Sequence, residues 1–176
     1  MRDNKQTLQP APSRMSEDDF VARFGAIYEH SPWVARAAWQ QGPNSEHDTV
    51  AGLASLMAAQ VEAADEAAQL ELMRLHPDLG GRAALAGELT AASAREQAGA
   101  GLDACTPEEY ERLQQLNSVY QEKFGFPFII AVAGLQRADI LAAMAARLDN
   151  DVPQERRTAL DEIHKIARLR LAAMTT

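Results

Sequence analysis

Apolar residues recur along this chain at intervals of three and four positions, the spacing of an amphipathic helix rather than of a strand. Several apolar stretches follow a helix start signal, in which a small polar residue precedes the first turn. The signals are Ser16 with Asp19, Ser31 with Pro32, Asp48, and Thr106 with Pro107. The pattern predicts an all-α fold, a single-domain bundle of about eight helices.

Helix stop signals place the ends of individual helices. A helix over residues 64–75 ends at His76, because Pro77 disfavours the helical conformation in the residue before it. The helix that begins at Thr106 stops at Gly125. Further helices are predicted over residues 16–27, 48–61, 138–148 and 153–174.

One short segment breaks the helical pattern. Residues 126–132 (FPFIIAV) have strand-like propensity and lie between Gly125 and Gly134. A lone strand cannot form a sheet, so we expect an extended or helical chain buried among helices. Such a buried segment presents free main-chain amides that can bind a ligand. Asn117 lies within the apolar stripe of the preceding helix, where we expect its amide to bond a neighbouring loop.

The sequence predicts one domain preceded by an arm. Residues 1–15 are polar and contain Pro10 and Pro12, which predicts a flexible N-terminal arm, and residues 16–176 form the helical domain. Residues 80–90 follow a helix end and begin with two glycines, so we expect a loop or a short helix there.

Composition narrows the classes of protein to consider. With 176 residues and 47% hydrophobic content, the chain is large enough to bury a substantial core. Its formal net charge of −8 argues against nucleic-acid binding, which needs a basic surface. The single cysteine, Cys105, excludes an intrachain disulfide. The apolar runs are too short to span a membrane and a signal-peptide core is absent, so we expect a cytoplasmic protein.

Two neighbouring segments carry candidate chemistry. An imidazole at His76 lies beside unpaired helix carbonyls, whose partial negative charge keeps it basic; the alternative is a simple C-terminal helix cap. Ser93, Glu96 and Gln97 have the spacing that places a hydroxyl, a carboxylate and an amide on one helix face. The alternative for this trio is a solvated polar face that opens with a capping box, with Ser93 as the cap.

The last helix carries a charged residue on its apolar face. On a helical wheel, Arg170 falls within an arc formed by Leu160, Ile163, Ile166, Ala167, Leu171 and Met174. A guanidinium on a core-facing stripe is costly unless it meets an anion. That anion is either a ligand or an internal salt-bridge partner, for which Glu96 is a candidate.

Five short motifs occur in order along the chain. They are HPDL at 76–79, S-x-x-E-Q at 93–97, AGLD at 100–103, LN-x-x-Y-x-x-KFGFPFII at 116–130 and IARLRL at 166–171. In this combination the chain resembles the OHCU decarboxylase family over about residues 20–173. The resemblance implies a carboxy-lyase of urate degradation that converts 2-oxo-4-hydroxy-4-carboxy-5-ureidoimidazoline to (S)-allantoin. It also implies a central buried ligand pocket, no cofactor, and the homodimer that relatives often form.

The resemblance assigns roles to residues as well. His76 is the implied general acid/base, Glu96 orients the imidazole or exchanges a proton, and Arg170 binds the substrate carboxylate or the developing oxyanion. The implied substrate-binding residues are Pro77, Ser93, Ala94, Arg95, Glu96, Gln97, Phe128, Ile129, Ile130, Ala131, Val132 and Arg170. Residues 128–132 would act through their main chain. No metal ion is implied.

Two other classes of protein remain as alternatives. A metal hydrolase is disfavoured, because His30, His47, His76 and His164 are scattered without a close ligand pair. A non-enzymatic helical adaptor would use the same polar residues as caps and internal hydrogen bonds. Turnover of the ureidoimidazoline would distinguish the enzyme from the adaptor.

Overall fold

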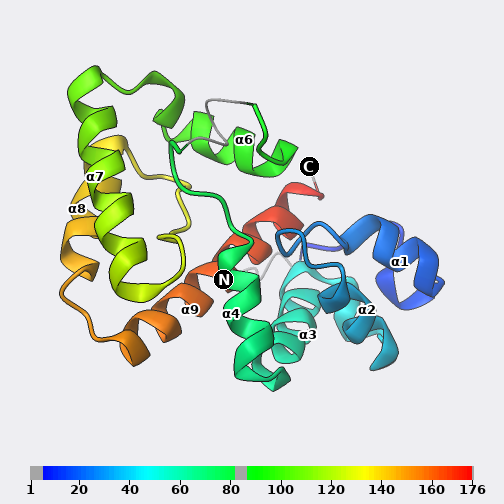
Figure 1. Cartoon of the computed structure of the whole chain (residues 1–176). Helices are drawn as coiled ribbons and strands as arrows, with labels where there is room; N and C mark the ends of the chain where they lie inside the picture. The colour runs from blue at the N-terminus through cyan, green and yellow to red at the C-terminus, as the bar shows by residue number, and fades with distance from the viewer. Residues whose placement is uncertain (1–5, 82–86, 176) are drawn as a thin grey trace, which may run out of the picture. The chain divides into compact units, whose positions relative to one another are not determined.

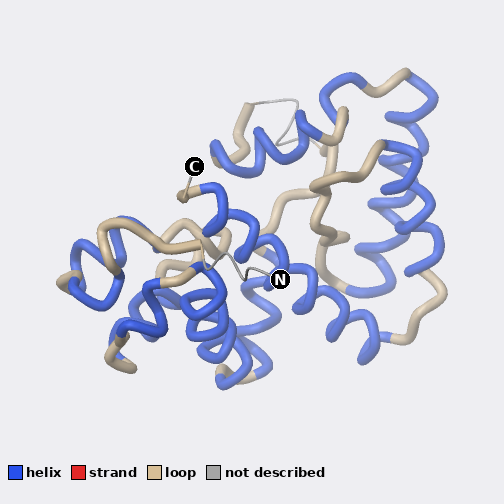
Figure 2. The backbone as a smooth tube through the Cα atoms, turned by 180° about the vertical axis from the view of Figure 1, so that it is seen from behind, coloured by secondary structure: helices blue, strands red, loops and turns tan. Residues whose placement is uncertain are grey.

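The computed structural model describes residues 6–81 and 87–175 of the chain (Figure 1). These residues contain eight α-helices and no strand, and Figure 2 shows the helices joined by loops. An isolated antiparallel bridge joins Thr7 to Thr49. The prediction of an all-α fold is therefore confirmed. No helix in this part of the chain is long and apolar enough to cross a membrane.

The chain divides into two compact units, which we describe separately. Unit 1 comprises Met1–Leu72 and His164–Thr176, and unit 2 comprises Met73–Ile163. The boundaries fall inside two helices, α4 (Glu66–Arg74) and α9 (Val152–Ala173). Each of these helices therefore begins in one unit and ends in the other.

Unit 1 contains α1 (Glu17–Phe24), α2 (Trp33–Gln40) and α3 (Val50–Ala63), and each of these helices contacts the next. Two short 3-10 helices, η1 (Pro12–Arg14) and η2 (Ser45–Asp48), contact each other. The buried apolar residues of this unit include Leu8, Phe20, Phe24, Val34, Ala38, Leu53, Met57, Val61, Ala167 and Leu171. They fall at the helical spacing that the sequence displays.

The segment before α1 is tied to unit 1 over the part that the structure describes. Leu8 is fully buried, and its amide donates a hydrogen bond to the main-chain oxygen of Asp48 (2.8 Å). The amide of Val50 donates in turn to the main-chain oxygen of Gln6 (2.9 Å). Residues 6–15 thus have anchoring contacts where the sequence predicts a flexible arm, and residues 1–5 lie outside the described residues.

Two of the predicted helix start signals are wrong. Ser31 does not cap α2, because its hydroxyl donates to the main-chain oxygen of Glu29 (2.8 Å). Asp48 does not cap α3, because its carboxylate accepts hydrogen bonds from the amide and the hydroxyl of Ser13 (both 2.8 Å). Thr49 is the cap of α3 instead. Ser31 thus bonds to a residue just before it in sequence, and Asp48 bonds to a distant one.

Unit 2 contains α6 (Ala91–Gly99), η3 (Leu102–Ala104), α7 (Pro107–Phe124) and α8 (Arg137–Arg147). Helix α6 contacts η3, and α7 contacts α8. The start of α7 is as predicted, with a capping box in which Thr106 and Glu109 exchange hydrogen bonds of 3.1 Å. Its end is also as predicted, because Gly125 adopts the left-handed conformation with φ 77°.

Residues 126–132 form a largely buried segment that is neither strand nor helix, so the predicted burial is confirmed and the helical alternative is wrong. The ring centroids of Phe128 and Tyr120 lie 5.3 Å apart. The guanidinium carbon of Arg147 lies over the Phe128 ring, 4.3 Å from its centroid. Arg147 also donates to the main-chain oxygen of Ile129 (2.7 Å) and to the fully buried carboxylate of Glu155 (2.7 Å). A buried ionic network therefore fixes the course of this segment.

Candidate active site

The loop after α4 carries the first candidate residue. Helix α4 ends at Arg74, and the amide of His76 donates a hydrogen bond to the main-chain oxygen of Met73 (3.2 Å), which completes a final turn. The chain then leaves the helix at Pro77, as the sequence predicts. His76 is 8% exposed, so its imidazole is enclosed rather than part of the solvated surface.

Helix α6 carries the second group of candidates. Its cap is Thr90, whose hydroxyl accepts from the amide of Ser93 (3.2 Å), so the alternative in which Ser93 is the cap is wrong. Ser93 and Gln97 are buried at 4% and 5% exposure, and Glu96 is half-buried. This burial contradicts a solvated polar face. Ala94 and Arg95, by contrast, are exposed.

Gln97 joins the two segments directly. Its side-chain oxygen accepts from the amide of Gly80 (2.9 Å), and its nitrogen donates to the main-chain oxygen of Asp78 (3.3 Å). Asn117 on α7 donates to the main-chain oxygen of Leu79 (3.1 Å), which confirms the prediction that it bonds a neighbouring loop. The HPDL and S-x-x-E-Q motifs are therefore parts of one hydrogen-bonded structure within unit 2.

Asp78 lies in the same loop and is half-buried. Its side-chain oxygen Oδ1 accepts from Nε2 of Gln121 (2.5 Å). Burial raises the pKa of this carboxyl group above its ordinary value, and the hydrogen bond from Gln121 opposes that rise. The effect of burial is the larger, so the carboxyl group of Asp78 holds its proton more tightly in the folded protein than in the unfolded chain.

Residues 128–132 offer main-chain donors. The amide of Ala131 donates to Glu162 (3.2 Å), and the oxygen of Ile129 accepts from Arg147. Within residues 6–81 and 87–175, the amides of Ile130 and Val132 make no hydrogen bond. A ligand that accepts hydrogen bonds from these amides would therefore have two donors available.

Arg170 belongs to unit 1, where it forms an ion pair with Glu29. The distance between Nη2 of Arg170 and Oε2 of Glu29 is 2.8 Å, and the side chains are 8% and 1% exposed. The internal partner that the sequence analysis sought for Arg170 is thus Glu29, a residue the sequence did not suggest. No local pattern links them, because they lie at opposite ends of the chain.

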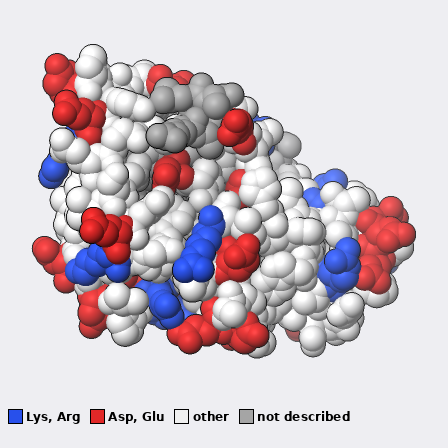
Figure 3. All heavy atoms as spheres, in the orientation of Figure 1, with Lys and Arg blue, Asp and Glu red and all other residues white. Residues whose placement is uncertain are grey.

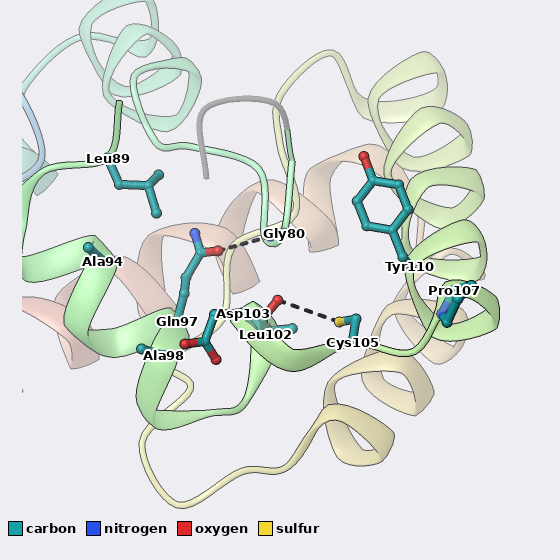
Figure 4. A pocket seen from close by; sticks show the side chains of 10 residues that line it. All are labelled: Gly80, Leu89, Ala94, Gln97, Ala98, Leu102, Asp103, Cys105, Pro107 and Tyr110. Atoms are coloured by element: carbon teal, nitrogen blue, oxygen red, sulfur yellow. Dashed lines mark hydrogen bonds between the residues drawn. The ribbon is translucent and has the colours of Figure 1, made fainter. Parts of the chain in front are cut away.

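A cavity of about 770 Å³ lies in unit 2 beside the loop (Figure 4). It is lined by Gly80, Leu89, Ala94, Gln97, Ala98, Leu102, Asp103, Cys105, Pro107 and Tyr110. Figure 4 shows the amide of Gln97 reaching to Gly80 and the thiol of Cys105 directed at the main-chain oxygen of Leu102. Burial raises the pKa of this thiol, and the nearby carboxylate of Glu109 adds to the rise. Of the predicted substrate residues, Ala94 and Gln97 line this cavity.

The charged surface gives few further clues. On the face in Figure 3, basic side chains lie singly or in small groups among acidic ones. An anionic ligand would therefore be bound by local groups rather than attracted by the overall charge of −8. In the described part of the chain, no three His, Cys, Asp or Glu residues gather as metal ligands.

Sequence reasoning missed three polar residues that the structure connects to the candidates. Glu29 pairs with Arg170, and Gln114 and Gln121 on α7 bond to the loop after His76. A signal for the two glutamines existed, since their spacing from Asn117 places all three amides on one side of α7. Glu29 gave no such signal.

The comparisons with known proteins point to one family. The family model described as OHCU decarboxylase matches residues 13–172. The protein named 2-oxo-4-hydroxy-4-carboxy-5-ureidoimidazoline decarboxylase in Haloferax volcanii is 49% identical over 166 residues, covering 94% of each chain. The Mus musculus protein of the same name is 42% identical over 157 residues, covering 89% of this chain and 86% of its own.

Two solved structures are similar as well. A crystal structure of (S)-allantoin synthase has a TM-score of 0.74 at 31% identity, covering 93% of this chain and 52% of that chain. This chain thus spans about half the length of that protein. A crystal structure of OHCU decarboxylase in the presence of (S)-allantoin has a TM-score of 0.67, covering 91% of this chain and 99% of that chain. Its 24% identity supports a likeness of fold alone.

Proposed function

Because the chain belongs to the OHCU decarboxylase family, we propose that it converts 2-oxo-4-hydroxy-4-carboxy-5-ureidoimidazoline to (S)-allantoin and CO2. The relatives that carry the name of this decarboxylase extend over nearly the whole chain, so the proposal concerns the entire domain. The reaction would need no cofactor, since the C=N and carbonyl groups of the substrate ring can delocalise the electron pair that CO2 leaves behind.

The observation that supports this proposal most directly is the bond between two motifs. Gln97 of the S-x-x-E-Q helix holds the loop after His76 by two hydrogen bonds, and His76 itself is 8% exposed. An enclosed imidazole in a fixed loop suits proton transfer near neutral pH better than a solvated helix cap would.

The catalytic roles follow the resemblance. His76 would act as general acid/base, and the half-buried Glu96 would orient the imidazole or exchange a proton with the ring. Arg170 would bind the substrate carboxylate or the developing oxyanion, since a guanidinium forms paired hydrogen bonds with such groups. The ion pair with Glu29 and the hydrogen bonds that Nη1 donates to the main-chain oxygens of Ala26 (3.5 Å) and Ile27 (3.4 Å) hold this guanidinium in place.

The remaining candidates would orient the substrate ring. Ser93 would donate a hydrogen bond to a carbonyl of the ureido group or ring. The side-chain nitrogen of Gln97 has two N–H groups; one donates to Asp78, and the other would donate to a substrate carbonyl. The amides of Ile130 and Val132 would bind the amide edge of the ring. Pro77 would form one wall. Orientation of this kind lowers the barrier by removing the entropic cost of alignment.

The proposed step breaks the bond between the ring carbon and its carboxylate. CO2 leaves, and the electron pair moves into the C=N system of the ring. A proton is then added to a ring carbon from one side, which would set the S configuration. His76 and Glu96 are the two groups of unit 2 that we propose to handle these protons.

The activity can be tested with freshly generated substrate. Urate is treated with uricase and hydroxyisourate hydrolase, the protein is added, and (S)-allantoin is followed by circular dichroism. We expect rapid formation of the S form by the wild type and none above background by His76→Ala. His47→Ala is a matched control, because His47 serves only the capping box of η2 and should leave the rate unchanged.

Two outcomes would contradict the proposal. A wild-type protein that leaves the slow, racemic background reaction unchanged would favour the adaptor alternative. If His76→Ala were fully active, the proposed decarboxylase activity would stand, but the proposed role of His76 as general acid/base would be refuted.

For the assembly we propose a homodimer, as the resemblance implies, and for the location the cytoplasm, as the sequence analysis predicts. Light scattering coupled to size-exclusion chromatography would test the dimer, for which a mass of one chain, 19.2 kDa, would be the contrary result. Imaging of the tagged protein in its own cell would test the location.

A further inference from the structure

Side chains from two helices hold the loop after His76. Each carbonyl of residues 78–80 accepts a hydrogen bond from a side-chain amide: Asp78 from Gln97 at 3.3 Å, Leu79 from Asn117 at 3.1 Å, and Gly80 from Gln114 at 3.0 Å. The position of the loop therefore depends on residues far from it in sequence.

Three of the side chains that bond to this loop come from one face of α7. Gln114, Asn117 and Gln121 are spaced by three and four residues, so they project from the same side of the helix. Their partners run in the opposite order along the loop: Gly80, then Leu79, then the side chain of Asp78. One helix face thus binds three consecutive loop residues, and Gln97 of α6 binds two of them, Asp78 and Gly80, from a second helix.

The loop approaches α7 closely at Gly80. This residue has φ +62°, and a Cβ atom added there would lie 2.5 Å from Cδ2 of Leu113. Glycine therefore permits both the backbone conformation and the short distance to the helix. The amide of Gly80 donates at the same time to Gln97 (2.9 Å), so the residue is fixed from both helices.

The side chain of Asn117 lowers the stability of the folded protein relative to an apolar side chain at this position. It is 5% exposed, and within the described residues its Oδ1 atom is buried without a hydrogen-bond partner. A buried carbonyl oxygen without a partner costs about 1–3 kcal/mol, and an apolar side chain would avoid that cost. The benefit of the amide lies in its one directed bond to Leu79, which sets where the loop runs.

We propose that Gln97, Gln114, Asn117 and Gln121 form an amide clamp whose function is to position the imidazole of His76. Only Pro77, with its fixed φ, separates His76 from the clamped residues, so a shift of the loop is transmitted to the imidazole. Gln114, Asn117 and Gln121 are positioning residues that act through the loop. The inference rests on the proposed function, since it assumes that His76 transfers protons.

The test replaces an amide by the carboxylate of the same shape. In Asn117→Asp and Gln114→Glu, an oxygen replaces the donor and faces a loop carbonyl, which repels it. For both variants we expect kcat to fall by about 10- to 100-fold while KM changes by less than about threefold. Assays are run where circular dichroism shows each variant to be folded, and if Asn117→Asp does not fold, the half-exposed Gln114 carries the test.

A control variant and a second measurement complete the experiment. Gln115→Glu makes the same chemical change one residue further along α7, at an exposed position outside the clamp, and should leave kcat and KM unchanged. Hydrogen exchange followed by mass spectrometry should show faster exchange at residues 78–81 in the two clamp variants but not in Gln115→Glu.

The outcomes separate the clamp from the proposed function. If wild type is active, His76→Ala is inactive, and both clamp variants keep full kcat, the clamp is refuted and the function stands. A rise in KM at constant kcat in the clamp variants would also overturn the clamp, because that result would mean that these amides contribute to substrate binding and not to the position of His76. If wild type itself is inactive, the proposed function fails, and unchanged exchange at residues 78–81 in the variants would then overturn the clamp as well.

Discussion

Glu29 and Arg170 form a buried ion pair in unit 1, with a distance of 2.8 Å between Oε2 and Nη2. The pair resolves the question of how an arginine is accommodated on the apolar side of the last helix. Both charges have left water, and the attraction between them offsets the cost of that transfer only while both are present. The pair also holds the guanidinium that we propose to bind the substrate.

Loss of one partner should therefore destabilise the protein strongly. We expect Glu29→Gln to lower the free energy of unfolding by about 3–5 kcal/mol, because Arg170 would remain buried without its counter-charge. Urea denaturation followed by circular dichroism measures this change. Glu17→Gln is the control: it breaks the more exposed pair with Arg36 (3.5 Å) and should cost less than about 1 kcal/mol. Equal, small effects of both substitutions would contradict the prediction.

The close approach of Gly80 to Leu113 predicts a cost beyond that of backbone strain. Gly80→Ala should lower the free energy of unfolding by about 1–2 kcal/mol for the positive φ, with about 1–3 kcal/mol more for the contact with Leu113. Gly134→Ala isolates the first part, since Gly134 has φ +79° and no atom within 4 Å of an added Cβ. Thermal or urea unfolding of both variants gives the difference. Equal losses at the two positions would show that Leu113 simply moves aside.

The raised pKa of Asp78 predicts a specific dependence of stability on pH. Because burial makes the pKa higher in the folded than in the unfolded protein, the folded state binds the proton more tightly. The resulting stabilisation is complete below the pKa of the unfolded chain and is lost as the pH rises through the folded-state pKa. Asp78→Asn cannot ionise, yet its amide oxygen can still accept from Gln121.

The stability of Asp78→Asn relative to wild type should therefore increase as the pH rises through this range and then level off. Urea midpoints measured from below the ordinary pKa of an aspartate to neutral pH test this expectation. A difference that stays constant with pH, or one that shrinks as the pH rises, would contradict it.

The sequence predicts the helices well because their signals are local and repeated. The start of α7 combines a threonine cap, a proline and an acidic residue at the third position, and the structure contains that capping box. Ser31, followed by Pro32, and Asp48 carried fewer such signals, and neither is a cap: Ser31 bonds to Glu29 two residues before it, and Asp48 bonds to Ser13. A cap is thus predictable where several neighbouring residues agree on it.

The site was predicted less completely because its contacts are not local. Asn117 was recognisable as a buried amide, and the spacing of Gln114 and Gln121 from it indicates that the three amides share one side of α7, but not which residues they bond. Glu29 is the clearest example of a contact that local sequence cannot predict, since its partner Arg170 lies 141 positions away and no periodicity connects the two. Contacts of this kind follow from the fold and need coordinates.

Cys105 has a practical consequence for experiments on this protein. It is the single cysteine of the chain and lies on the wall of the cavity beside Gly80 and Gln97. Its raised pKa disfavours the reactive thiolate, so alkylating reagents should label it more slowly than an exposed thiol, and faster as the pH rises. A fluorophore or spin label attached there would report on the neighbouring loop at a native position, without engineering of other thiols.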